Sequence, residues 1–133
     1  MQDIVELYKH FERFDKNTDQ ELRLHIFPSL NLKQYKKHYD GNELIGFTNW
    51  AFVSDNVLHE FKKTGNLENK DWNSGSNLLF VDFVATKNVR QIFKWCIEQA
   101  SKFVGLKEEF TWTRIENDKV KRIIKRKRYW VVS

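Results

Sequence analysis

The residue with the clearest chemical potential is Asp82, a carboxylate inside the apolar run of residues 78–84. A run of this length that follows a polar turn is typical of a strand buried on both faces. A carboxylate there must be paired, protonated or chemically used. Desolvation would raise the pKa of Asp82 towards the working pH and suit it to general-base catalysis. A structural Asp82 would instead accept hydrogen bonds from its neighbours, and the spacing leaves both interpretations open.

The other potentially reactive side chains are four scattered histidines and one cysteine. The histidines are His10, His25, His38 and His59. They lack the spacing of a metal site, so we expect no metal. Cys96 falls on the apolar stripe of an expected helix, which favours a packed thiol over a nucleophile. The chain also lacks the glycine-rich loops of nucleotide sites and the serine elbow of hydrolases.

Length and composition predict one globular domain over residues 1–133. The chain is 41% apolar and 15% aromatic, which is enough for a hydrophobic core. A single cysteine suits a reducing compartment. The charged, amphipathic N-terminal stretch is no secretory signal, and no apolar run is long enough to span a membrane. We therefore expect a cytoplasmic protein.

The net charge of +5 comes from one C-terminal segment, since the rest of the chain has 16 basic against 18 acidic residues. The basic residues of this segment are Lys119, Lys121, Arg122, Lys125, Arg126, Lys127 and Arg128. Such a segment can dock an acidic carrier protein or a phosphate-bearing donor. It can also bind nucleic acid, with Tyr129 and Trp130 stacking on bases, or form a solvated face. Because the rest of the surface is not basic, nucleic acid is the less favoured partner.

Hydrophobic periodicity and turn residues predict the order of the elements. The expected elements are a helix over residues 2–14, a short helix or irregular turn over 22–32, a hairpin over 35–53 with its turn at Asp40-Gly41, a helix from the N-cap Ser54 to 63 with Gly65 as its stop, a buried strand over 78–85, a helix from Thr86 or Asn88 to Gly105, and a strand over 110–115. The basic end shows both helical and strand features. This order predicts an α/β (α+β) fold with helices flanking a single mixed sheet.

An ordered set of residues around Asp82 resembles the toxin-activating lysine acyltransferases, which acylate RTX haemolysins from acyl-carrier protein. The matching residues are Pro28, Gln34, Tyr35, Trp50, Ala51, Trp72, Ser74, Gly75, Phe80, Asp82 and Phe83. The resemblance covers residues 28–84 well and the later part loosely. It implies a fold similar to the GCN5-related N-acetyltransferases, in which helices flank a splayed mixed sheet.

The resemblance also implies roles for individual residues. Asp82 takes the place of the catalytic aspartate, and either His10 or His25 serves as the catalytic histidine, because no histidine aligns without a gap. Trp50, Trp72, Ser74 and Gly75 would shape the donor channel. The implied reaction moves an acyl group from acyl-carrier protein or acyl-CoA to an amine such as a protein lysine, with no bound cofactor. A basic patch of Lys121, Arg122, Lys125, Arg126, Lys127 and Arg128 would dock the donor.

An alternative is a catalytically silent relative that keeps this fold. Such a protein, of the compact kind that phages encode, would bind a protein partner or form a homodimer or a larger assembly. A histidine within reach of Asp82 would favour the enzyme over this alternative.

Overall fold

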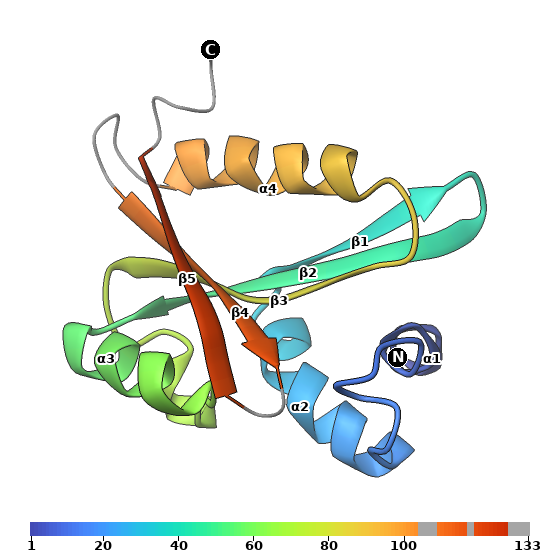
Figure 1. Ribbon diagram of the computed structural model, residues 1–133, viewed down its shortest axis with the longest axis horizontal. Helices are drawn as coiled ribbons and strands as arrows, with labels where there is room; N and C mark the ends of the chain where they lie inside the picture. The colour runs from blue at the N-terminus through green and yellow to red at the C-terminus, as the bar shows by residue number, and fades with distance from the viewer. Residues whose placement is uncertain (104–108, 117–118, 128–133) are drawn as a thin grey trace.

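The computed structural model describes residues 1–103, 109–116 and 119–127, and a five-stranded sheet forms its centre (Figure 1). The strands are β1 Tyr35–Asp40, β2 Glu43–Val53, β3 Asn77–Ala85, β4 Glu109–Glu116 and β5 Lys119–Lys127, and they neighbour one another in chain order. β3 and β4 pair in parallel, whereas the other neighbouring strands pair antiparallel. The predicted mixed sheet is confirmed, and the basic end resolves as a strand as far as Lys127.

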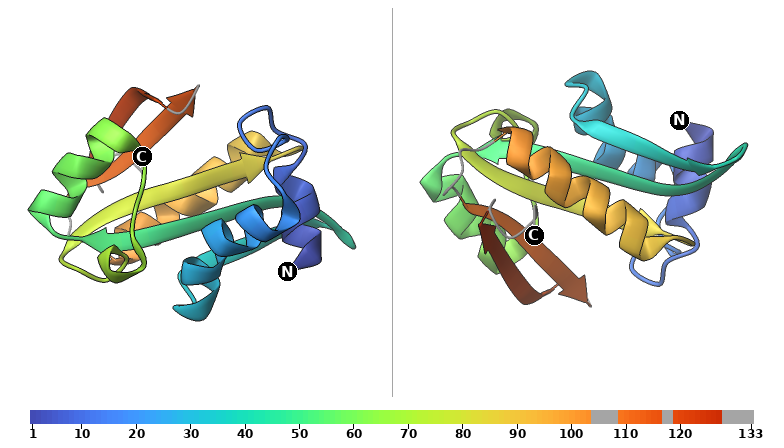
Figure 2. Two further views of the ribbon diagram at one scale, coloured as in Figure 1. Left: turned by 90° about the horizontal axis from the view of Figure 1, so that it is seen from below. Right: turned by 90° about the horizontal axis from the view of Figure 1, so that it is seen from above.

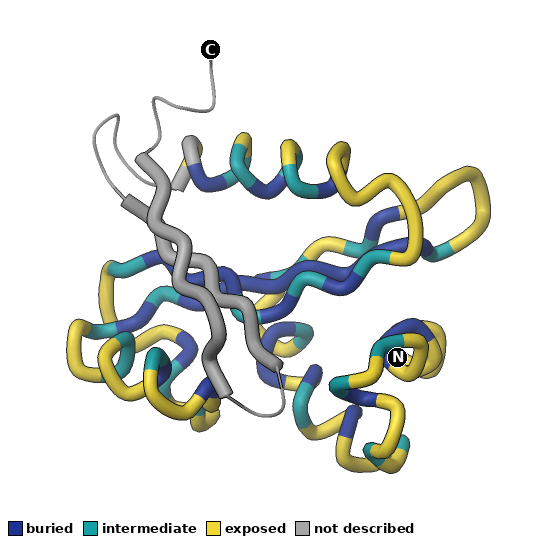
Figure 3. The backbone as a smooth tube through the Cα atoms, in the orientation of Figure 1, coloured by how far each residue is buried: buried dark blue, intermediate teal, exposed yellow. Residues whose placement is uncertain are grey.

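Helices cover both faces of this sheet. They are α1 Gln2–Tyr8, α2 Asp19–Asn31, α3 Asp55–Thr64 and α4 Val89–Phe103, with a short 3-10 turn, η1 Asn69–Asp71, ahead of β3. α4 lies on one face, and α1, α2 and α3 lie on the other (Figure 2). The central strands β2 and β3 are largely buried between these two layers (Figure 3). The layered arrangement confirms the predicted α+β fold.

The β1–β2 hairpin forms at the predicted Asp-Gly turn. Gly41 has a φ of +61°, a left-handed conformation that glycine adopts without steric cost. Side chains of β2 alternate between the two layers, as predicted. Phe47 packs in the core formed with α1 and α2, whereas Trp50 packs in the core formed with α4. Burial on both sides confirms that β2 is a central strand.

The predicted ends of α3 are confirmed. The Ser54 hydroxyl oxygen accepts a hydrogen bond from the Val57 N–H at 3.2 Å, which caps the first turn. Gly65 follows the last turn with a φ of 72°, the usual conformation of a glycine stop. Phe61 is the fully buried anchor of the helix.

α4 begins directly after Asn88, one of its two predicted caps. The Asn88 carbonyl accepts the first helical hydrogen bond from the Ile92 N–H at 3.0 Å. Ile92, Cys96 and Ala100 follow at four-residue steps and are all buried. The predicted end at Gly105 lies outside the described residues.

The predicted helix over residues 2–14 is wrong beyond Tyr8. The chain turns after α1, and the Phe14 ring comes to lie 4.9 Å from the Tyr8 ring, where both are buried. A straight helix would separate these residues by about 9 Å along its axis. Tertiary packing of the two aromatic rings therefore outweighs the helical pattern of the sequence.

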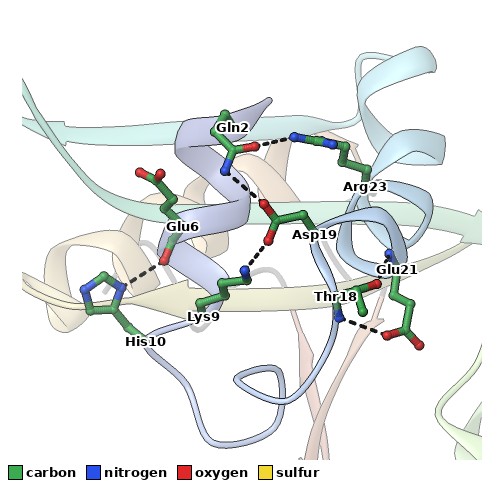
Figure 4. Close-up of polar contacts among 8 residues, drawn as sticks. All are labelled: Gln2, Glu6, Lys9, His10, Thr18, Asp19, Glu21 and Arg23. Atoms are coloured by element: carbon green, nitrogen blue, oxygen red, sulfur yellow. Dashed lines mark hydrogen bonds and ion pairs between the residues drawn. The ribbon is translucent and has the colours of Figure 1, made fainter.

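α2 is a full helix. For this segment the sequence predicted either a short helix or an irregular turn. Thr18 and Glu21 form a capping box, in which each side chain accepts a hydrogen bond from the backbone N–H of the other, at 3.1 and 2.9 Å (Figure 4). The Thr-x-x-Glu spacing was visible in the sequence and marks the true start of the helix.

An irregularity in β3 sets the direction of Asp82. Asn49 lies opposite Asp82, but the next residue of β2, Trp50, lies opposite Phe80. Val81 is therefore an extra residue on β3, which makes this a β-bulge. Val81 packs in the core under α3, and Asp82 bonds to side chains of α1 and α2, so two consecutive residues face the same layer. The bulge turns Asp82 away from α4.

The sheet opens beside this bulge. Within the described residues, the parallel pairing of β3 with β4 extends from Leu78 to Phe80 of β3. Figure 1 shows β4 and β5 crossing the direction of β3 at a wide angle. This opening agrees with the splayed sheet that the resemblance implied.

Candidate active site

Asp82 and His25 form a hydrogen-bonded pair between β3 and α2. The His25 Nε2 atom lies 2.8 Å from Asp82 Oδ2, although the two residues are 57 positions apart in the chain. Of the two candidate histidines, His25 is the one that the fold brings to the aspartate.

The surroundings of Asp82 favour its charged form. Burial acts to raise the pKa of Asp82, but the charge of His25 and the hydrogen bonds from His25 and Tyr8 outweigh burial and lower the pKa from its ordinary value. The predicted upward shift is wrong, because the sequence showed the apolar neighbours but not the donors. Asp82 is thus a charged partner of the histidine, and its low pKa makes it a weak base.

The same pairing makes His25 the more basic member of the dyad. The negative charge of Asp82 raises the pKa of His25 above its ordinary value of 6.5, against the opposing effects of burial and of Arg13. The His25 side chain is 34% exposed, compared with 8% for Asp82. Nε2–H donates to Asp82, and no described residue bonds to Nδ1. Nδ1 is therefore the ring nitrogen that a proton-transfer role of His25 would use.

Tyr8 is a third member of the site that the sequence did not reveal. Its hydroxyl donates a hydrogen bond to Asp82 Oδ2 at 2.8 Å, and its side chain is fully buried. Burial, together with the charge of Asp82, raises the pKa of Tyr8 well above its ordinary value, so the hydroxyl remains a donor. The sequence assigned Tyr8 to an apolar helix face, and only its polar end hinted at another role.

Asn49 and Ser29 extend the polar cluster, and both are fully buried. Asn49 Oδ1 accepts a hydrogen bond from the Asp82 N–H at 2.7 Å. Asn49 Nδ2 donates to the Ser29 hydroxyl at 3.1 Å and lies 3.4 Å from Asp82 Oδ2. An amide within the aromatic strand β2 was the available sign of this network, since buried amides need partners.

His10, the other candidate histidine, lies away from this cluster. It is exposed just beyond α1, and its Nδ1 atom lies 3.0 Å from the Glu6 carbonyl oxygen (Figure 4). Nearby, Lys9 and Gln2 bond to the Asp19 carboxylate and so tie α1 to the start of α2. Among the described contacts, none joins His10 to Asp82.

The predicted donor residues Trp72, Ser74 and Gly75 fold onto the end of β2. Trp72 is buried under α3. The Ser74 hydroxyl accepts from the Ser54 N–H at 3.1 Å and donates to the Asp71 carbonyl at 2.8 Å. A Cβ atom on Gly75 would lie 2.6 Å from the Ser54 backbone, so this close approach requires glycine. These contacts give the three residues a structural role, and donor binding by them stays a prediction.

Trp50, the fourth predicted donor residue, faces the opposite layer from Asp82. Its ring lies 6.0 Å from the ring of Trp95 on α4. The two tryptophans border a second polar cluster on this face of the sheet.

This second cluster contains His38, Thr48 and Cys96. His38 Nε2 lies 2.9 Å from the Thr48 hydroxyl oxygen, and burial with the nearby Lys36 charge lowers the pKa of His38 to about 4. Burial raises the pKa of Cys96 to about 12, while a hydrogen bond with Thr48 opposes this shift. Cys96 is fully buried, which confirms the packed thiol.

The predicted basic patch lies on and beyond β5. Lys121, Arg122, Lys125, Arg126 and Lys127 belong to β5, at the edge of the sheet, whereas Arg128 lies outside the described residues. The docking role of the patch stays a prediction. In the described part of the chain, no helix has the length and apolarity needed to cross a bilayer, and no three potential ligands gather into a metal site.

Comparison with known proteins places this chain in a family. An uncharacterized protein of Synechocystis sp. is 36% identical over 64 residues, which cover 46% of this chain and 44% of that protein. The chain therefore spans less than half the length of this relative. The model of the RTX toxin acyltransferase family matches residues 1–127, a range that includes α1, α2 and the Asp82 strand. The chain belongs to the RTX toxin acyltransferase family.

Proposed function

We propose that this protein transfers an acyl group from a thioester donor, acyl-carrier protein or acyl-CoA, to an amine such as a protein lysine. The observation that carries the proposal is the 2.8 Å bond between His25 and Asp82, with the histidine partly exposed. An imidazole that is oriented by a carboxylate and open at its other nitrogen is suited to general-base catalysis.

The reaction requires a neutral amine, because a lysine ammonium has no lone pair. Nδ1 of His25 accepts a proton from the ammonium, and the amine nitrogen then attacks the thioester carbonyl carbon. The nitrogen of the resulting intermediate gives a second proton to the leaving thiolate as the carbon–sulfur bond breaks, and His25 releases the first proton to solvent. Asp82 stabilises the imidazolium that forms in the first step, consistent with its raising of the His25 pKa.

The position of His25 supports catalysis over the silent alternative. A relative that had lost its activity would not need a histidine within hydrogen-bonding distance of Asp82. Here three donors, from His25, Tyr8 and Asn49, converge on the carboxylate oxygen Oδ2. Such convergence maintains a charged carboxylate at a buried position, which is costly without a compensating role.

The test is to incubate the protein with labelled acyl-carrier protein or acyl-CoA and lysine-containing polypeptides and to measure transfer at several pH values. We expect transfer that rises with pH through the His25 pKa, above 6.5. Asp82→Asn should reduce the rate by about 10²-fold or more, because it removes the charge that supports the base.

Asp40→Asn is the matched control, since Asp40 is an exposed carboxylate at the hairpin turn. This variant should transfer at the rate of the unmodified protein. No transfer from either donor, or equal rates in Asp82→Asn and the unmodified protein, would contradict the proposal.

A further inference from the structure

The side chain of Asn49 replaces a missing backbone partner at the bulge. Because Val81 is inserted in β3, the pairing between β2 and β3 is interrupted beside Asp82. The Asp82 N–H donates instead to Asn49 Oδ1 at 2.7 Å, the shortest of the contacts that Asn49 makes in this cluster. The amide oxygen thus fixes the backbone of the residue that carries the carboxylate.

The other end of the same amide reaches the helix that carries the histidine. Asn49 Nδ2 donates to the Ser29 hydroxyl, which in turn donates to the Ile26 carbonyl of α2 at 2.9 Å. Ser29 lies four residues after His25, so the two side chains share one side of α2. A single amide therefore links the backbone of Asp82 to the helix face that presents His25.

We propose that Asn49 is a positioning residue that holds the β3 bulge and sets the orientation in which Asp82 meets His25. The position needs an acceptor for the Asp82 N–H and a donor for Ser29, and an asparagine side chain supplies both. A leucine there would supply neither, and the buried N–H of Asp82 would lose its partner. The geometric role holds for any reaction at the site, whereas its effect on acyl transfer rests on the proposed function.

The experiment compares Asn49→Ala with Thr48→Val by NMR titration of the histidines and by transfer assay. Thr48 is the matched control, because it is the adjacent fully buried polar residue of β2 and faces the opposite layer. We expect the His25 pKa to fall towards 6.5 in Asn49→Ala as Asp82 loses its fixed orientation. Transfer should fall by roughly 10–100-fold. Thr48→Val should change neither the His25 pKa nor the transfer rate.

Two outcomes separate this proposal from the proposed function. If the unmodified protein shows no acyl transfer and the His25 pKa still falls in Asn49→Ala, the positioning role of Asn49 stands and the proposed acyl transfer is wrong. If folded Asn49→Ala keeps the His25 pKa of the unmodified protein, the positioning role is overturned.

A measurement on the unmodified protein decides the case in which Asn49→Ala does not fold. The Asp82 amide proton and the Asn49 side-chain NH₂ group should shift with the same midpoint as His25, because one hydrogen-bonded network connects them. Resonances that stay constant through the His25 titration would overturn the proposal.

Discussion

The two faces of β2 and β3 each bury a histidine against a side-chain oxygen, but the two clusters differ in charge. His25 bonds to the Asp82 carboxylate at 2.8 Å, and His38 bonds to the Thr48 hydroxyl at 2.9 Å. The carboxylate raises the pKa of His25, whereas burial lowers the pKa of His38 to about 4. Nearly equal hydrogen-bond lengths thus accompany opposite pKa shifts.

The comparison shows that the partner and the exposure decide what a buried histidine can do. Without a carboxylate, burial keeps His38 neutral and locks it into the layer beneath α4. With a carboxylate and one open ring nitrogen, His25 can hold a proton near neutral pH. The α4 face therefore serves packing, and the α2 face can serve proton transfer.

The largest expected contrast is in acyl transfer after each histidine is replaced by glutamine. Glutamine keeps a hydrogen-bonding group but accepts no proton near neutral pH. His25→Gln should lower the transfer rate by about 10²–10⁴-fold, because the general base is lost. His38→Gln and the exposed His10→Gln should retain the rate of the unmodified protein in the same assay. Similar losses in His25→Gln and His38→Gln would remove the functional distinction between the faces.

A smaller contrast is expected in stability when one hydroxyl group is removed from each cluster. Tyr8→Phe removes a donor to a charged carboxylate and should lower the free energy of unfolding by about 1.5–3 kcal/mol. Thr48→Val removes a bond with the neutral His38 and a weak bond with the Cys96 thiol, and should cost about 0.5–1.5 kcal/mol. Urea unfolding at pH 6 measures both values. A larger cost for Thr48→Val would show that charge does not set the strength of the Asp82 cluster.

A third expected contrast is the opposite dependence of stability on pH in the two clusters. The raised pKa of His25 stabilises the fold below pH 6.5, and this contribution is lost as the pH rises through the His25 pKa. The lowered pKa of Asp82 gives a contribution that is present above pH 3.8 and is lost as the pH falls through the Asp82 pKa. The pair therefore stabilises the protein most between these two values. Partial exposure of His25 keeps the effect small.

His38 acts in the other direction over the same range. Its folded pKa of about 4 lies below 6.5, so the unfolded chain binds more protons and stability falls on acidification from pH 6.5 to 4. Urea unfolding between pH 4 and 8 should show a shallower alkaline loss in Asp82→Asn and a shallower acid loss in His38→Gln. Unchanged slopes in both variants would contradict the assigned pKa directions.

Local patterns in the sequence predicted the elements whose ends are set by residues close to them in the chain. Ser54 and Gly65 marked α3 because caps act within one turn, and Gly41 marked the hairpin because its turn needs a positive φ. The same reasoning failed after Tyr8, where a contact with Phe14 redirects the chain. The capping box at Thr18 is a local pattern of the same kind, and it starts α2 at Asp19, ahead of the predicted start at residue 22.

The site itself was only half predictable. Asp82 stood out as a charge in an apolar run, but its pKa depends on His25, which the chain brings to it from 57 residues away. The sequence did not distinguish His10 from His25 as the partner of Asp82, because the path of the chain between α1 and α2 decides which histidine contacts β3. Asn49 and Tyr8 carried a local sign, a polar group in an apolar segment, but the sequence did not show that both would contact Asp82.

The bulge at Val81 makes the site depend on where β3 breaks its alternation as well as on which residues β3 contains. Strict alternation along a regular strand that kept Val81 would direct Asp82 to the same face as Phe80, into the apolar layer beneath α4 with Trp50 and Cys96. The same residues in the same order, paired without the bulge, would thus separate the acid from its histidine. Substitutions can tune this site gradually, whereas loss of the bulge with Val81 retained would dismantle it.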